Sequence, residues 1–163
     1  MMMKKTDDQQ QSLGIMEMAP VRFFVPGKPI PGGSKRGFVN PRTGGVIITE
    51  AAGKANRDWR AMVVASCREV FKLPALEGPL KLRIDFRMPR PQSHYGSGRN
   101  KGVLKPTAPY YHTIRPDSVK LTRALEDALT HILWRDDSQN VILDVVKRYA
   151  DVNPGALVEV TPL

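Results

Sequence analysis

The segment from Leu80 to Met88 constrains the fold more than any other part of the chain, because apolar and charged residues alternate along it without interruption. Successive side chains of a β-strand point to opposite faces, so this alternation predicts a strand with one face in the core and the other in solvent or against a ligand. Such half-buried strands are typical of antiparallel sheets. The chain is therefore expected to build its core on one face of a sheet.

Two segments with helical periodicity are suited to cover that face. Apolar residues recur at intervals of three and four from Ala52 to Phe71, which predicts an amphipathic helix that ends before Pro74. Thr49 is the expected N-cap of this helix, because its hydroxyl can accept a hydrogen bond from one of the first backbone N–H groups. A second apolar stripe predicts a helix from about Asp117 to Leu133.

Three further strands are expected. Their composition predicts strands over 21–25, 141–149 and 156–160, and the turn residues before the last of these favour a terminal hairpin. The stretch from Pro26 to Gly45 is rich in proline and glycine and is expected to form a loop or loose hairpin. This order of elements predicts an α+β fold, a mixed and mostly antiparallel sheet packed by two helices.

The length of 163 residues is near the usual size of one domain. Residues 1–19 are polar and are expected to form a disordered N-terminal extension before a single domain over residues 20–163. The lone cysteine, Cys67, cannot form an internal disulfide, and its helical spacing places it in the core. No apolar run approaches the length of a membrane span. These features favour a protein of the reducing cytoplasm without a membrane partner.

The formal net charge of +9 indicates a polyanionic partner, because each phosphate that a basic side chain neutralises releases condensed counterions. The charges are clustered: the sequence has no acid between Glu17 and Glu50, and none between Asp85 and Asp117. The second window is a long insertion in which tyrosines and histidines alternate with basic residues, a mixture that suits a nucleic-acid backbone with exposed bases. The residues predicted to contact DNA are Lys28, Lys35, Arg36, Arg42, Arg90, Arg99, Lys101, Lys105, Arg115 and Lys120.

Five carboxylates surround the second predicted helix and the turn after it, namely Asp117, Glu126, Asp127, Asp136 and Asp137. Mg²⁺ prefers oxygen ligands, and metal-dependent phosphodiester cleavage needs carboxylates that converge on one point, so all five are candidate metal ligands. Structural roles are the alternative. Asp117 follows a proline and is suited to be an N-cap, and Asp136 and Asp137 are suited to a turn.

Three pieces of sequence carry a more specific signal. Residues 115–123 (Arg-Pro-Asp-Ser-Val-Lys-Leu-Thr-Arg), 126–129 (Glu-Asp-Ala-Leu) and 134–139 (Trp-Arg-Asp-Asp-Ser-Gln) follow one another in an order and spacing that resembles the signature of the RusA family of Holliday junction resolvases. Residues 24–29 are similar to the N-terminal strand and loop of that family. The resemblance covers about residues 21–161 and is strongest from Pro116 to Gln139.

The resemblance implies a homodimeric endodeoxyribonuclease that resolves four-way DNA junctions by paired nicks, with active sites formed by both subunits. It also implies dependence on Mg²⁺, with Mn²⁺ as a possible substitute. By position, Asp117 and Asp137 match metal-binding aspartates of the family, and Arg123 matches a functional lysine. An arginine can clamp a phosphate at that position, but it donates a proton less readily than a lysine.

The chain departs from the family pattern at Val119, where the motif has its second aspartate, and at Lys120, where asparagine is usual. Because residues seven apart lie on one stripe of a helix, we hypothesise that Glu126 supplies the missing carboxylate, with Asp127 or Asp136 as weaker substitutes. The competing hypothesis is a degraded metal site in a protein that binds branched DNA without cutting it. A nuclease that acts on RNA or on DNA flaps is a third reading.

Overall fold

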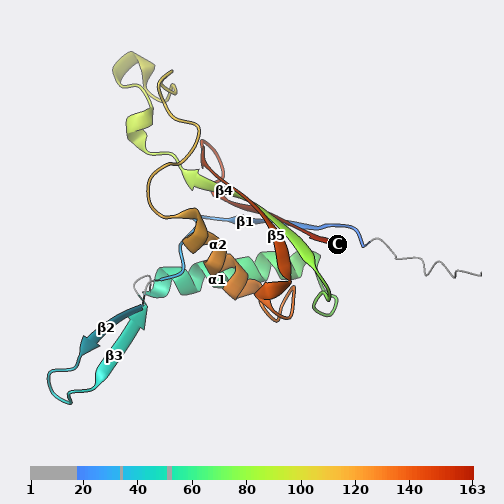
Figure 1. Ribbon diagram of the computed structural model, residues 1–163. Helices are drawn as coiled ribbons and strands as arrows, with labels where there is room; N and C mark the ends of the chain where they lie inside the picture. The colour runs from blue at the N-terminus through green and yellow to red at the C-terminus, as the bar shows by residue number, and fades with distance from the viewer. Residues whose placement is uncertain (1–17, 34, 51–52) are drawn as a thin grey trace, which may run out of the picture.

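The structure is a computed structural model that describes residues 18–33, 35–50 and 53–163, with only the backbone at 35, 36, 49 and 50. The predicted disordered extension lies outside the described residues except for its last two. The body is a four-stranded sheet in the order β1 (Val21–Pro26), β6 (Gly155–Pro162), β4 (Leu80–Pro89) and β5 (Asn140–Ala150). Strand β6 pairs antiparallel with β1 and β4, whereas β4 and β5 are parallel, so the predicted mixed, mostly antiparallel sheet is confirmed (Figure 1).

The predicted terminal hairpin is wrong. Strands β5 and β6 do not pair with each other, because β4 lies between them and hydrogen-bonds to both. The five inward side chains of β4, from Leu80 to Met88, are buried, and a strand at that depth needs partners for its backbone groups on both edges. The turn at 151–154 therefore carries the chain past the end of β4. Strand β5 becomes an edge of the sheet.

Both predicted helices exist and cover one face of the sheet (Figure 1). Helix α1 spans Gly53–Val70, so Thr49 is not its N-cap but a residue of the preceding strand. Helix α2 spans Ser118–Leu129 and ends four residues before the predicted Leu133. At this end the chain adopts a positive φ at His131, and the indole of Trp134 is fully buried. Burial of this indole favours the turn over a further helical turn.

The core lies between the inner face of the sheet and the two helices. It contains the inward residues of β4 together with Trp59, Val63 and Cys67 of α1 and the leucines of α2. This placement confirms Cys67 as a core residue. Burial raises the pKa of the Cys67 thiol to about 11, so the thiol is inert at neutral pH. None of the described helices is both long and apolar enough to span a membrane.

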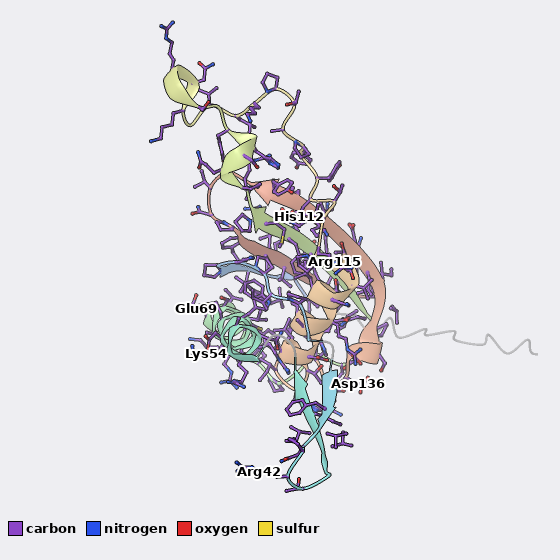
Figure 2. All side chains as sticks on the ribbon, turned by 90° about the vertical axis from the view of Figure 1, so that its left-hand side faces the viewer. Arg42, Lys54, Glu69, His112, Arg115 and Asp136 are labelled. Carbon is purple, nitrogen blue, oxygen red and sulfur yellow. The ribbon has the colours of Figure 1, made fainter. Side chains whose placement is uncertain are left out.

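Two arms project from this body in opposite directions (Figures 1 and 2). One is a β-ribbon of β2 (Lys35–Val39) and β3 (Val46–Glu50), an antiparallel pair that confirms the hairpin alternative and extends past the predicted end of this stretch at Gly45. The other is the long insertion after β4, which contains the short 3-10 helices η1 (Gln92–His94) and η2 (Gly98–Asn100). Arg42 lies at the far end of the ribbon, and Arg115 lies between the two arms (Figure 2).

Candidate functional site: a basic hollow at the start of α2

Asp117 occupies the N-cap position of α2, but its carboxylate does not cap the helix. The backbone carbonyl of Asp117 accepts the hydrogen bond from Leu121 N at 3.1 Å, as expected at an N-cap. The side chain, by contrast, accepts no capping bond and is 61% exposed; its one recorded ion pair is with Lys120 Nζ at 3.8 Å. The backbone of Asp117 therefore has the N-cap role that was the structural alternative, whereas its carboxylate is available for a ligand.

This carboxylate borders a hollow of about 540 Å³ that also brings together three predicted DNA-contacting residues. The hollow is lined by the segment 28–31, which follows β1, and by Arg115, Pro116, Asp117 and Lys120 at the start of α2. Lys28, Arg115 and Lys120 thus line the same hollow as Asp117, and Lys120 pairs with its carboxylate. A phosphate group is the ligand that such a charge arrangement favours.

Hydrogen bonds hold both walls of the hollow. Gly32 N donates to Lys120 O at 2.9 Å, and the buried Asn56 donates to Pro31 O at 2.9 Å, so the segment after β1 is fixed to both helices. On the other wall, Lys147 Nζ on β5 donates to Ile114 O at 2.8 Å and to Pro116 O at 2.6 Å. We did not predict this role for Lys147. Its signal in the sequence is a lysine between Val145 and Tyr149 on the inward face of β5, where apolar residues are expected.

His112 is a second unpredicted feature of this region. Its ring is 7% exposed, and its Nδ1 atom has no hydrogen-bond partner among the described residues. Burial lowers the pKa of His112, and the charges of Lys147 and Lys28 lower it further. The ring also packs on Tyr149, with their centroids 4.7 Å apart. The lowered pKa favours the neutral ring, and the bond from His112 N to Lys147 O, at 3.2 Å, joins the long insertion to the sheet.

The other candidate carboxylates lie at the opposite end of α2. Asn140 Nδ2 donates to Glu126 Oε1 at 3.1 Å. Burial raises the pKa of Glu126; the hydrogen bond from Asn140 opposes this, and the charges of Asp137 and Asp127 raise the pKa further. Glu126 is thus half-buried, close to other acids, and prone to bind a proton or a cation.

Asp136 has the structural role that the sequence left open. Its Oδ1 atom accepts from Ser138 N at 2.9 Å, and Gln139 Oε1 accepts in return from Asp136 N at 3.1 Å, which forms a capping box for the 3-10 helix Asp137–Gln139. These bonds from Ser138 lower the pKa of Asp136. Gln139 also donates to Leu76 O and Gly78 O, both at 3.0 Å. Asp136 and Gln139 therefore build the turn, and Asp137 beside them is exposed.

The candidate ligands do not form one cluster within the chain. An α-helix rises about 1.5 Å per residue, so nine residues separate Asp117 from Glu126 by about 13 Å along the axis and turn them to opposite sides. Among the residues that the structure describes, no three His, Cys, Asp or Glu side chains form a group that could hold a metal ion. Val119, at the position of the family's second aspartate, is 78% exposed.

The predicted DNA contacts fall into different environments. Arg42, Arg99, Lys101 and Lys105 are exposed on the two arms, and Arg123 is exposed on α2. Arg90 is not available for DNA in this structure, because its side chain is 4% exposed, pairs with Asp151, donates to Pro109 O at 2.8 Å and lies over the Tyr149 ring. The side chains of Lys35 and Arg36 lie outside what the structure describes.

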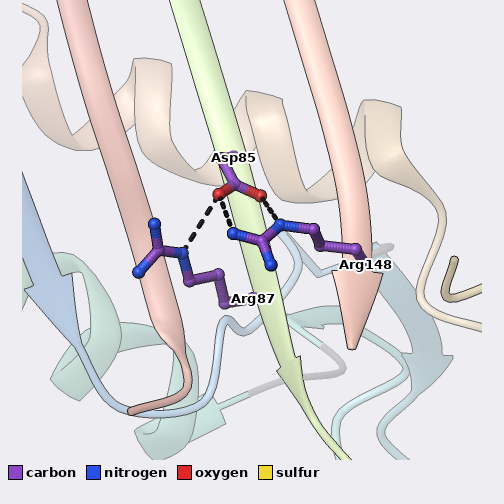
Figure 3. A network of polar contacts seen from close by, with 3 residues as sticks. All are labelled: Asp85, Arg87 and Arg148. Atoms are coloured by element: carbon purple, nitrogen blue, oxygen red, sulfur yellow. Dashed lines mark hydrogen bonds and ion pairs between the residues drawn. The ribbon is translucent and has the colours of Figure 1, made fainter. Parts of the chain in front are cut away.

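A larger hollow, of about 650 Å³, lies on the outer face of the sheet, but its charges are paired with one another. Arg148 donates two hydrogen bonds to Asp85, at 2.9 and 2.7 Å, and Arg87 donates a third at 3.0 Å (Figure 3). Partial burial raises the pKa of Asp85, but the bonds from Arg148 and Arg87 outweigh this and the pKa is lowered. Because these arginines are bound to a carboxylate, this face attracts phosphate less than the hollow at α2.

A basic hollow with one free carboxylate, on a body with two exposed basic arms, fits the class of proteins that bind nucleic acid and act on its phosphates. The family model described as Endodeoxyribonuclease RusA matches residues 26–161 of the chain. The chain therefore belongs to the RusA family of endodeoxyribonucleases, a family that acts on branched DNA, and the predicted resemblance is confirmed. The chain is also similar to the uncharacterized protein YqaN of Bacillus subtilis (strain 168), with 30% identity over 137 residues that cover 80% of this chain and 89% of the relative.

Proposed function

We propose that this protein is a metal-dependent endonuclease that resolves four-way DNA junctions by paired nicks, with its catalytic centre at Asp117. The observation that carries the proposal is the free carboxylate of Asp117 in a hollow with Lys28, Arg115 and Lys120. The three cations would hold and neutralise a backbone phosphate. Arg123 lies one helical turn after Lys120 on the exposed side of α2, and it would clamp a neighbouring phosphate.

The residues of the hollow fit Mg²⁺ in the way that nucleic-acid enzymes commonly bind it. Mg²⁺ keeps several waters and is held by one or two carboxylates together with substrate phosphates, so a single free aspartate beside a phosphate site is a suitable start. When bound, the metal would polarise the phosphate and lower the pKa of an attacking water. Mn²⁺, which suits the same oxygen ligands, is the expected substitute.

A second carboxylate is expected from a second copy of the chain. In a two-fold symmetric dimer, each surface contacts its counterpart, so two α2 helices that run antiparallel would bring the Asp117 end of one beside the Glu126 and Asp137 end of the other. Exposed apolar residues beside α2 support such contact: Val119 on the helix, and Val141, Ile142 and Leu143 on the edge strand β5. An apolar edge strand is a surface that proteins usually cover.

The second candidate function is a protein that binds branched DNA without cutting it, and the observation that favours it is Val119. A valine cannot bind metal, and among the described residues no three His, Cys, Asp or Glu side chains form a group that could hold a metal ion. On this hypothesis the cations of the hollow would still hold a phosphate, and the protein would shield a junction. Metal dependence separates the two functions.

The test is a cleavage assay with labelled substrates: a four-way junction, a flap, a linear duplex and a structured RNA, each with Mg²⁺, with Mn²⁺ and with EDTA. We expect paired, symmetric nicks on the junction in either metal and none in EDTA. The Glu126→Gln variant is expected to cut much less. Tight junction binding without a cut under any condition would establish the binding function instead, and preference for the flap or the RNA would assign another substrate.

A further inference from the structure

The β2–β3 ribbon is apolar on both of its faces, and both faces are in solvent. In the register of the pair, Phe38 lies opposite Ile47 on one face, whereas Val39 opposite Val46 and the neighbouring Ile48 lie on the other. These five side chains are between 38% and 68% exposed. The ribbon extends away from the sheet and the helices (Figure 1).

This pattern is not that of an arm that packs against its own domain. A ribbon that covers a core has one apolar and one polar face, as β4 has. An isolated two-stranded ribbon is at best marginally stable in water, and exposed apolar clusters usually mark a binding surface. An element that is apolar on both faces fits a partner that can enclose it from both sides.

Charge and position identify DNA as that partner. The one carboxylate of the ribbon sequence is Glu50, the last residue of β3, whereas the basic residues are Lys35, Arg36 and Arg42, of which Arg42 lies at the exposed end (Figure 2). The base of the ribbon is continuous with the basic hollow, because Gly32, just before β2, is bonded to Lys120. DNA with a phosphate in the hollow would therefore run alongside the ribbon.

We propose that the β2–β3 ribbon enters the branch point of the DNA and packs its apolar side chains against unstacked bases there. Two-stranded ribbons fit the major groove of DNA, and apolar side chains of DNA-bending proteins separate base steps. Five residues per strand reach roughly 16 Å, which is more than the depth of a groove. Valine, isoleucine and phenylalanine cannot read base edges by hydrogen bonds, so the ribbon recognises open stacking rather than sequence. This inference rests on the proposed function and adds the element that selects a branch.

The experiment uses a four-way junction with 2-aminopurine at the branch point, since this base fluoresces more strongly when it is unstacked. The wild type is expected to raise the fluorescence. The Phe38→Ser and Ile48→Ser variants, one for each face, are expected to abolish the rise and to bind the junction about tenfold more weakly, with unchanged binding to linear duplex. The control is Leu73→Ser, an equally apolar and 62% exposed position after α1, which should behave as the wild type.

A conservative variant guards against loss of folding. Phe38→Trp keeps a ring for stacking, so it should bind as the wild type does, and its fluorescence should change on the junction, because Trp59 and Trp134 are buried. Serine variants that retain both the 2-aminopurine rise and the affinity would overturn the inference. So would serine variants that change the mass of the free protein in sedimentation, since the ribbon would then contact a second copy. If instead the wild type does not prefer junction over duplex, it is the proposed function that fails.

Discussion

At the scale of single residues, Asp117 and Asp136 differ in what their carboxylates do, although both belong to the motifs that resemble the RusA signature. Asp136 is bound to Ser138 and Gln139 in a capping box, whereas the carboxylate of Asp117 caps nothing although it stands at an N-cap. From the sequence, each of the two residues could be either a metal ligand or a structural residue of a cap or turn. Composition and spacing could not separate them, because the choice depends on side-chain rotation and on the partners that the tertiary structure supplies.

This difference predicts that Asp136→Ala lowers the melting temperature, by roughly 2–4 °C for a chain of this size, because it removes the bond to Ser138 N. Asp117→Ala is expected to leave the melting temperature unchanged. Thermal unfolding followed by circular dichroism, with both variants at the same protein concentration, checks the pair. Equal losses for the two variants would show that Asp117 is a capping residue after all.

Glu126 gives a pH-dependent prediction. Because its pKa is raised in the folded protein, mainly by burial, folding favours the protonated form, and that stability is present at acidic pH and lost as the pH rises through the folded pKa. Glu126→Gln removes the charge and keeps an oxygen that can accept from Asn140. The variant is therefore expected to gain stability relative to the wild type between about pH 4 and pH 7.

Urea unfolding at several pH values measures this gain. A variant that is less stable than the wild type at pH 7 would contradict the assigned shift. If Glu126 also binds a divalent metal, as proposed, Mg²⁺ is expected to stabilise the wild type more than the variant.

At the scale of elements, most of the fold could be predicted from periodicity. The alternation in β4 and the apolar stripes of α1 and α2 gave elements that the structure confirms. The predicted β5–β6 hairpin failed because local turn residues do not reveal that β4 takes the place between the two strands. Strand β3 was not predicted either. Its apolar residues are exposed and do not pack on the core, so its sequence lacks the alternation of apolar and polar residues that predicts a half-buried strand.

Lys147 shows how an element positions the hollow. Its ammonium on β5 fixes the carbonyls of Ile114 and Pro116, immediately before Asp117. Lys147→Met is expected to cost about 1–3 kcal/mol in the free energy of unfolding and to reduce junction cutting, because the segment before α2 loses its anchor. The variant should also raise the pKa of His112, which the Lys147 charge lowers.

An NMR titration of the His112 ring measures this pKa, and urea unfolding measures the stability. The two readouts are independent of activity. An unchanged His112 pKa together with normal cutting would show that Lys147 does not support the hollow.

At the scale of the whole molecule, the proposed active site needs residues from two chains. One α2 helix separates Asp117 from Glu126 and Asp137, and a two-fold partner would reunite these ends. Mixed dimers test this arrangement. Asp117→Asn and Asp137→Asn homodimers are each expected to be inactive, whereas their mixture should recover nicking, because half of the mixed sites would contain neither substitution. A mixture as inactive as its components would place Asp117 and Asp137 in the same site of one chain.

We propose that Asp117 is the catalytic carboxylate of a junction endonuclease, and single-turnover cleavage by Asp117→Asn tests this role most directly. With the four-way junction fully bound in Mg²⁺, the variant is expected to cut roughly 100-fold more slowly or worse and to bind the junction as tightly as the wild type. Cutting at the wild-type rate would contradict the claim and move the catalytic centre away from the hollow at α2.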